Sequence, residues 1–565
     1  MFRANDAHLQ GSLFSAVDEL PPKLRTDLDS SWAGVFYREV FCRLDEGAFA
    51  DLYAGKGSRP NTPVNVLLGF EIIKAGFGWS DSVTYERFTY DLQVRYAVGY
   101  RTFGEGHFRL RTVYNFRKRL REYRERTGRD LLAVAFERIT DEQLRALELN
   151  TSQVRMDSTQ IASNIRDVSR LQFLVEVLIR VRRMLSLADR ERYGLLLDRY
   201  ITKSSTKFVF DVSSAQGRVH IAEIGRIMAK LVDELAQDYG QHETYALLKR
   251  VFEEQFIQDD EDGWRPRKHN EFGSPLVCSP DDQEASTRRK RGVVHKGYVV
   301  NVTETCAEEN PVQLIVKVQT APNIKTDVGF LKEAVICLKR RLDIDTCYTD
   351  GGYNQEALYR MMSPLGIEHL QTGIQGHPST TRLGLYQYQI SKSATGEPLT
   401  VICPNGQQTL VQSYRPGRYH AAFEHDQCRG CPYTDCCRSN RNSLHRTVYF
   451  TDYDLEIARR RLYIESIKDQ ASNPRSAVES TVYSVKRPFG NKLPVRGCFR
   501  VHSLMIGSAC MANVRRIMRA MKQIVGPDGH TPAAARRQTV SFSSFSKLVT
   551  YATQLLRPRL GMCPS

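Results

Sequence analysis

The chain has 565 residues, with 80 Lys and Arg against 64 Asp and Glu, a net charge of +16 and a sequence pI of about 9.2. A hydrophobic content of 41% excludes wholesale disorder, and the length suits about three or four folding units. No apolar run reaches the ~18–20 residues that span a bilayer, and the N-terminus lacks a secretory signal pattern, so we expect a cytoplasmic protein with no membrane partner. The positive charge favours a polyanionic partner, most simply nucleic acid.

The first 148 residues are predicted to form a helical unit. Proline is absent from residue 64 to residue 265, which is typical of helix-rich sequence. Ser80 is a plausible N-cap, and a further helix is predicted over about 112–126. The apolar positions of this helix repeat on one face: Val113, Phe116, Leu120 and Tyr123.

The other face of this helix is strongly basic. Residues 109–129 contain nine Lys and Arg against two Glu, a net charge of +7. We interpret it as a helix that lies along DNA phosphates, with Arg117, Lys118 and Arg121 as contact residues. The alternative is a solvated face whose arginine stems cover apolar surface.

From residue 154 the pattern becomes that of an α/β domain. A short strand ends at Asp157, and a long helical stretch follows over 166–257. The sequence then predicts this order of elements: strands at 297–305 and 312–320, a helix at 327–342 and a strand at 343–350.

Two of these strands finish at an acid, Asp157 and Asp350, at the sheet edge where α/β sites form. Each is ordinary turn chemistry when taken alone. A third carboxylate, Glu479, lies on a predicted helix that starts at Asn473-Pro474. Flanking cations on the same face make a surface ion-pair ladder the alternative interpretation.

Three segments carry a family resemblance: DST at 157–159, DGGY at 350–353 and RSAVESTVYSVK at 475–486. They resemble the acidic motifs of insertion-sequence DDE transposases, most closely the branch numbered eleven-eighty-two in the IS-four-like superfamily. Arg475, Glu479 and Lys486 fit the third motif, Tyr-x2-Arg-x3-Glu-x6-Lys, whereas Ser472 stands at its tyrosine position.

The resemblance extends from about residue 59 to 520, because residues 59–100 and 111–120 are similar to the helical N-terminal DNA-binding domain of these enzymes. It implies an α/β fold with an RNase H-like core, a mixed five-stranded sheet with helices. The implied layout is a helical DNA-binding domain (1–148), the first part of the core (149–350) with a helical insertion (about 166–257), a Cys-rich insertion (351–470), the Glu helix and end of the core (471–525), and a tail (526–565).

The implied activity is DNA cleavage at element ends followed by strand transfer. Asp157 would bridge two Mg²⁺ (or Mn²⁺) ions, with Asp350 on one ion and Glu479 on the other. By the same resemblance, Arg475 and Lys486 would hold phosphates, and Thr159 and Tyr353 would shape the site.

The implied partners are double-stranded DNA, as terminal inverted repeats and target, and a second copy of the chain in a homodimer on DNA. The protein would associate with the nucleoid when bound. No phosphate-binding loop for a nucleotide is present. Two alternatives remain: a transposase-derived DNA-binding protein that no longer cuts, and an RNase H-like nuclease without strand transfer.

Five of the 13 cysteines lie between residues 403 and 437. Thiolates from two separated arms can close a tetrahedral Zn²⁺ site. We expect a structural zinc ion, and Cys437 is the substitute for Cys436. His420 and His425 are weaker alternatives. The favoured ligands are Cys403, Cys428, Cys431 and Cys436.

Overall fold

The protein was analysed as a computed structural model of the whole chain. The structure describes residues 1–10, 15–55, 59–259, 263–273, 275–290, 292–373, 381–393, 396–441, 445–467, 476–490 and 492–525. Arg475, Ser472 and the predicted tail (526–565) lie outside these residues. Within the described ranges, no helix combines the length and apolar character needed to cross a membrane.

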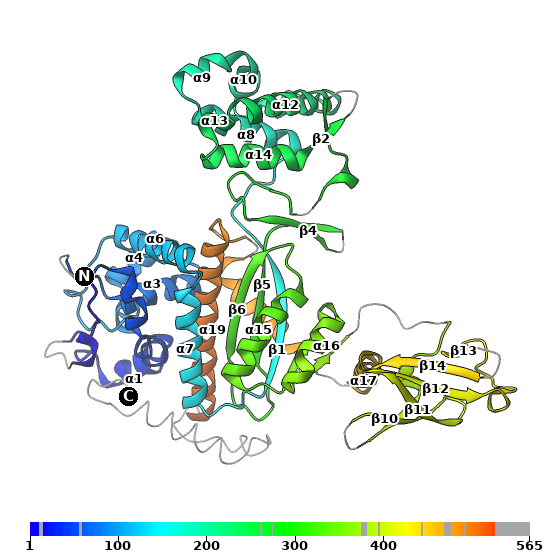
Figure 1. Cartoon of the computed structure of the whole chain (residues 1–565). Helices are drawn as coiled ribbons and strands as arrows, with labels where there is room; N and C mark the ends of the chain where they lie inside the picture. Colours follow the sequence, from blue (N-terminus) through cyan, green and yellow to red (C-terminus); the bar gives the residue numbers. More distant parts are fainter. Residues whose placement is uncertain are drawn as a thin grey trace.

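The N-terminal part is helical, as predicted (Figure 1). Ser80 caps α4 by accepting a hydrogen bond from Val83 N, and the predicted face of α6 is buried. The helices are α1 (Pro22–Ser30), α2 (Trp32–Phe36), α3 (Val64–Phe77), α4 (Asp81–Tyr90), α5 (Leu92–Ala97), α6 (Leu110–Thr127) and α7 (Leu131–Ala146), with short helices at Ala7–Leu9, Tyr37–Phe41 and Glu46–Leu52.

The central sheet is mixed. Strand β5 lies antiparallel between β1 and β6, and β7 and β8 continue parallel on the other side of β1. Helices flank the sheet, an arrangement that fits an RNase H-like core. The strands are β1 (Gln153–Ala162), β4 (Ser286–Lys290), β5 (Val293–Thr305), β6 (Ile315–Pro322), β7 (Thr346–Thr349) and β8 (Glu368–Gln371).

The sheet has six strands among the described residues, one more than the five expected. The additional strand, β4, pairs with the first part of β5 and contains the basic run Arg288-Arg289-Lys290. Charged residues suit an unpaired sheet edge because they discourage pairing with another chain.

The helices around this sheet follow the predicted order. α15 starts with Thr326 as its N-cap, and α18 and α19 come at the end of the core. The bounds are α15 (Asp327–Leu342), η5 (Gly351–Tyr353), α16 (Glu356–Met362), η6 (Ser363–Leu365), α18 (Ser476–Lys486), η9 (Arg487–Phe489) and α19 (Cys498–Val525).

Helix α19 lies between the N-terminal helices and the sheet (Figure 1). It crosses α3 closely, since a Cβ built on Gly76 would meet Met511 Cγ at 2.3 Å and one on Gly507 would meet Ala75 Cβ at 2.7 Å. One continuous hydrophobic core therefore joins the N-terminal helices to the sheet.

The helical stretch predicted at 166–257 has a separate core, and it stands at the end of the sheet that carries β4 (Figure 1). Its elements are α8 (Arg170–Met184), α9 (Leu187–Arg192), α10 (Gly194–Ile201), α11 (Ser205–Phe210), α12 (Ser214–Glu234), α13 (Ala236–Tyr239) and α14 (Glu243–Gln255), followed by β2 (Phe256–Asp259), β3 (Gly263–Pro266) and η4 (His269–Glu271).

A second six-stranded sheet with its own small core forms between β8 and α18. Its order is β13-β14-β12-β11-β10-β9, and all its pairs are antiparallel. The bounds are η7 (Leu385–Gln387), β9 (Gln389–Lys392), β10 (Pro398–Ile402), β11 (Gln408–Arg415), β12 (Arg418–Glu424), η8 (Asp426–Cys428), β13 (Asn440–Arg441), β14 (His445–Thr451) and α17 (Asp452–Ile467).

Candidate active site

The two predicted aspartates lie on neighbouring parallel strands. In the β1–β7 ladder Arg155 is level with Tyr348, so the same register, two residues further along, brings Asp157 level with Asp350. Both side chains are half-buried. Asp350 caps the short helix η5 by accepting a hydrogen bond from Gly352 N at 2.8 Å. β7 ends at Thr349, directly before Asp350, but β1 continues to Ala162 because it stays paired with β5, so Asp157 lies inside its strand and not at its end as predicted. The register still places the two carboxylates side by side, where β7 ends.

Another carboxylate, Asp327, which was not among the predicted site residues, lies close to this pair. It is the first residue of α15, and Ser158 Oγ donates a hydrogen bond to its Oδ1 at 2.5 Å. A Cβ built on Gly352 would lie 3.0 Å from oxygens of both Asp327 and Asp350. Asp327 could not be identified from the sequence, because an acid in the first turn of a helix is ordinary.

Tyr353 lies close to the carboxylates of this site. Its ring is fully buried, and its hydroxyl donates to Asn301 Oδ1 at 2.8 Å. Burial raises the pKa of Tyr353 well above its ordinary value, and the charges of three carboxylates add to the shift: Asp327, Asp157 and Asp350.

Helix α18 carries Glu479, exposed in its first turn, and lies along β1. Arg155 and Asp157 are two residues apart, so they share one face of β1. Arg155 pairs with Glu304 of β5, and Thr481 of α18 donates to the same carboxylate. Glu479 therefore comes from the helix that covers the Asp157 face of the sheet.

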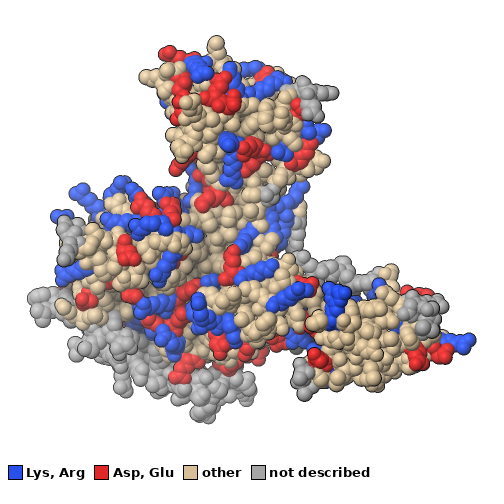
Figure 2. Space-filling view, in the orientation of Figure 1, with Lys and Arg blue, Asp and Glu red and all other residues tan. Residues whose placement is uncertain are grey.

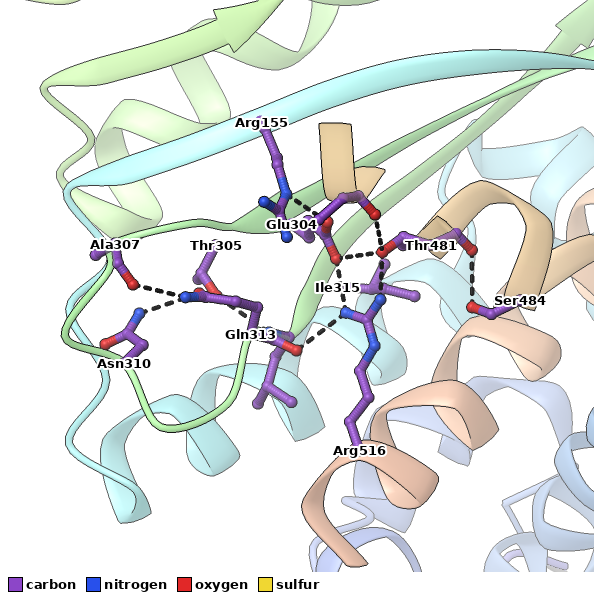
Figure 3. Close-up of polar contacts among 12 residues, drawn as sticks. Arg155, Glu304, Thr305, Ala307, Asn310, Gln313, Ile315, Thr481, Ser484 and Arg516 are labelled. Carbon is purple, nitrogen blue, oxygen red and sulfur yellow. Dashed lines mark hydrogen bonds and ion pairs between the residues drawn. The ribbon is translucent and has the colours of Figure 1, made fainter. Parts of the chain in front are cut away.

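The Glu304 carboxylate joins four elements, and it is completely buried (Figure 3). Its oxygens lie 2.6 Å from Arg155 Nε, 2.7 Å from Thr481 Oγ1 and 2.6 Å from Arg516 Nη1. Arg516 also donates to Gln313 O at 3.0 Å and to the Thr481 hydroxyl. These hydrogen bonds and ion pairs thus link four elements beside the site: β1, β5, α18 and α19.

The side chains that were predicted to contact phosphate differ in their burial and in their partners. Lys486 is half-buried, and its ammonium donates to Gln160 O at 3.3 Å. Lys118 and Arg121 are exposed on α6, and among the described residues each forms an ion pair with a Glu one turn away. Figure 2 shows Lys and Arg side chains gathered over the upper part of the N-terminal helices, where Figure 1 places α6.

Arg117 is half-buried and forms ion pairs with acids of two neighbouring helices instead. It binds both oxygens of Asp81, at 2.8 and 2.6 Å, and Glu71 at 2.7 Å. Burial alone would raise the pKa of Asp81, but hydrogen bonds from Arg117 and Lys74 outweigh it and hold the pKa well below its ordinary value. These contacts favour a structural role for Arg117, because phosphate contact would have to break them.

A wide groove of about 960 Å³ begins next to Glu479, at Ser480. It lies between the end of α3, one face of α18 and one face of α19. Ser480, Tyr483, Ser484 and Arg487 follow each other at helical spacing along one wall. No Asp or Glu is among the described residues that line it.

Four cysteines of the second sheet surround a small cavity of about 30 Å³: Cys403, Cys428, Cys431 and Cys437. Neither Cys436 nor the two candidate histidines line it. The turns after Cys403 and Cys428 are each closed through a glycine in the left-handed region, Gly406 (φ 78°) and Gly430 (φ 70°). The arrangement thus brings together three of the four favoured ligands, with Cys437 as the fourth.

Among the described residues, no three or more His, Cys, Asp or Glu side chains are spaced as ligands of one metal ion. The donor types nevertheless fit: half-buried carboxylates at the sheet edge suit Mg²⁺, and clustered thiols suit Zn²⁺.

No curated protein and no solved structure matches the chain. Residues 402–518 match a family described as a transposase DDE domain. The matched segment contains Glu479, Lys486 and the four clustered cysteines, and ends in α19. This match supports the assignment of the chain as a DDE transposase.

Proposed function

We propose that this protein is a transposase of the IS-four-like, eleven-eighty-two-type branch, which cleaves DNA at element ends and joins the freed 3′-hydroxyl to target DNA. The observation that carries the proposal is the position of Asp157 on β1 and of Asp350 directly after the neighbouring parallel strand β7, beside the helix that bears Glu479. The family match over the Glu479 segment supports it.

Asp157, Asp350 and Glu479 are the proposed ligands of two Mg²⁺ or Mn²⁺ ions. Their oxygens are the hard donors that these ions prefer, and the negative charge around Tyr353 is a reason for cations to bind. When bound, such ions activate the attacking oxygen and stabilise the leaving oxygen of an in-line displacement at phosphorus.

The remaining residues position the DNA. Lys486, and Arg475 by the motif spacing, hold phosphates near the scissile bond. Lys118 and Arg121 contact the duplex from α6, since weak surface pairs with Glu exchange readily for phosphate. The protein acts as a homodimer on DNA and associates with the nucleoid.

The test is incubation of the full-length protein and Mg²⁺ with linear DNA that carries the terminal repeats flanking its gene. The wild type yields cleaved ends and joined products. Asp157→Asn, Asp350→Asn and Glu479→Gln bind the ends but do not cut them. The control is Asp343→Asn, an exposed aspartate at the left-handed end of α15 (φ 51°), which keeps activity.

The outcomes separate the alternatives. Cleavage that persists in Asp157→Asn refutes the site assignment. A wild type that binds ends without cutting indicates a transposase-derived DNA-binding protein. Cutting without joined products indicates an RNase H-like nuclease.

We further propose that the cysteine cluster binds a structural Zn²⁺ ion, with Cys437 in place of Cys436. Cys437 lines the shared cavity, whereas Cys436 Sγ lies 3.6 Å from Tyr433 O, outside it. Binding requires the four sulfurs to move inward to about 2.3 Å from the ion. The ion would hold the turn after β10 to the Cys428–Cys431 turn.

The two adjacent cysteines make a matched test. The wild type and Cys436→Ser should purify with about one zinc ion per chain, measured by mass spectrometry, and Cys437→Ser with much less. Equal zinc in both variants contradicts the choice of Cys437. A wild type free of zinc after expression with added zinc refutes the site.

A further inference from the structure

The groove beside Glu479 has four arginines and several aromatic side chains in its walls. One of these arginines, Arg516, forms the ion pair with Glu304, which leaves three others. Arg487 follows α18, and Arg515 and Arg519 lie one turn apart on α19. Arg487 and Arg519 are exposed. Among the described residues, none of the three forms an ion pair with a carboxylate.

Arg515 is held in place by neutral partners. Its guanidinium donates to Gly76 O at 2.7 Å and lies 5.2 Å from the centre of the Phe77 ring. Burial, and next the charges of Arg487 and Arg519, lower its pKa. The three cations are thus close enough to repel one another, and a concave wall of like charge concentrates anions.

The aromatic side chains add a second kind of contact. Tyr483 of α18 is 66% exposed, and Trp32 and Phe77 line the opposite wall. Trp32 and Phe77 pack edge to face, with centroids 4.9 Å apart, so the ring positions are fixed. Exposed rings in a basic groove are the features by which proteins stack unpaired bases.

A fully paired duplex can contact the arginines of this groove but not its aromatic rings. Its phosphates can meet the arginines, but its bases are stacked inside and cannot reach the rings. An unpaired strand offers both phosphates and base faces. The position of the groove beside Ser480, the residue after Glu479, connects it to the proposed active site.

We propose that this groove binds an unpaired single-stranded segment of the DNA substrate, with a base against Tyr483 and phosphates on Arg487 and Arg519. The inference rests on the proposed function, since it assumes that DNA is the substrate.

Fluorescence anisotropy with the full-length protein tests the inference. One labelled duplex has a short unpaired oligo-dT tail, and the other is the same duplex without the tail. The wild type should bind the tailed duplex more tightly, and Tyr483→Ala should weaken its binding about 5-fold or more while leaving the blunt duplex unchanged.

Further variants separate stacking from charge. Arg487→Ala combined with Arg519→Ala should weaken binding of the tailed duplex and lower its salt dependence by about two phosphates. Phe210→Ala, an aromatic residue 89% exposed on α11, and Arg226→Ala, exposed on α12, are matched controls that should behave as the wild type. Circular dichroism verifies that each variant is folded.

Equal affinity of the wild type for the two duplexes overturns the inference, and so does a tail preference that survives Tyr483→Ala. If the wild type cuts repeat ends but shows no tail preference, the inference fails while the proposed function stands. If the wild type binds neither DNA, both fail together.

Discussion

Replacement of Glu304 by Gln should detach the helix that carries Glu479. The Gln side chain keeps the shape of Glu304 but removes the negative charge that Arg155 and Arg516 both contact. Those two arginine side chains are only 11% and 15% exposed, so water cannot replace the lost charge. Removing one charged member of a buried ion-pair network costs about 3–5 kcal/mol.

Hydrogen exchange followed by mass spectrometry can locate this loss. Peptides from β5, α18 and the end of α19 should exchange faster, by a factor that corresponds to the lost free energy. Peptides from α8 and α12 serve as an internal reference, because the helical stretch has its own core. DNA cleavage should fall together with the protection of α18.

A surface substitution provides the matched control. Glu356→Gln removes the same charge from an exposed i,i+4 pair with Arg360 and should cost less than about 1 kcal/mol. Unchanged protection of α18 in Glu304→Gln would show that the network does not anchor this helix. An equal loss of protection in α8 and α12 would contradict the local explanation.

Three other outcomes are expected. Gly352→Ala should displace the Asp350 and Asp327 carboxylates and lower cleavage without changing DNA binding, whereas Gly373→Ala, where a Cβ meets open space, should leave both unchanged. Burial, and next a neighbouring arginine, lower the pKa of His369 to about 3 from 6.5. The folded state therefore keeps His369 neutral. The free energy of unfolding is highest above pH 6.5 and falls as the pH drops from 6.5 toward 3, by on the order of 5 kcal/mol, because only the unfolded chain binds the proton in that range. Urea unfolding above and below pH 6.5 should show a weaker pH dependence in His369→Gln, and an unaltered dependence would contradict this assignment. Gly76→Ala should destabilise the junction of α3 and α19 by about 1–3 kcal/mol, measured by urea unfolding, because its Cβ overlaps Met511, whereas Gly217→Ala in α12 has room and should stabilise its helix; a stable Gly76→Ala protein would show that the crossing adapts.

The sequence predicted the elements with strong periodicity. The buried face of α6 and the order of β1, β5, β6, α15 and β7 follow directly from apolar spacing, because these elements bury one face in a large core. The second sheet was not predicted. No residue of its strand β11 is fully buried, and the sequence QTLVQSYR does not alternate apolar and polar residues, which is the pattern that identifies a half-buried strand.

Parts of the site depend on residues that are distant in the chain. The internal role of Arg117 requires Glu71 and Asp81, which only folding brings to α6. Cys436 and Cys437 are equivalent in spacing, and the fold decides which one faces the cavity. Asp157, Asp350 and Glu479 were identified from strand ends and motif spacing, and their roles as metal ligands stay predictions.

The close crossing of α3 and α19 has a consequence for where the DNA is cut. Because one hydrophobic core includes the N-terminal helices and the sheet, α6 and the two aspartates cannot move apart on a hinge. Under the proposed function, a duplex bound by α6 therefore presents one fixed phosphate to the two aspartates. A few base pairs inserted between the recognised sequence and the cut should abolish cleavage rather than shift its position.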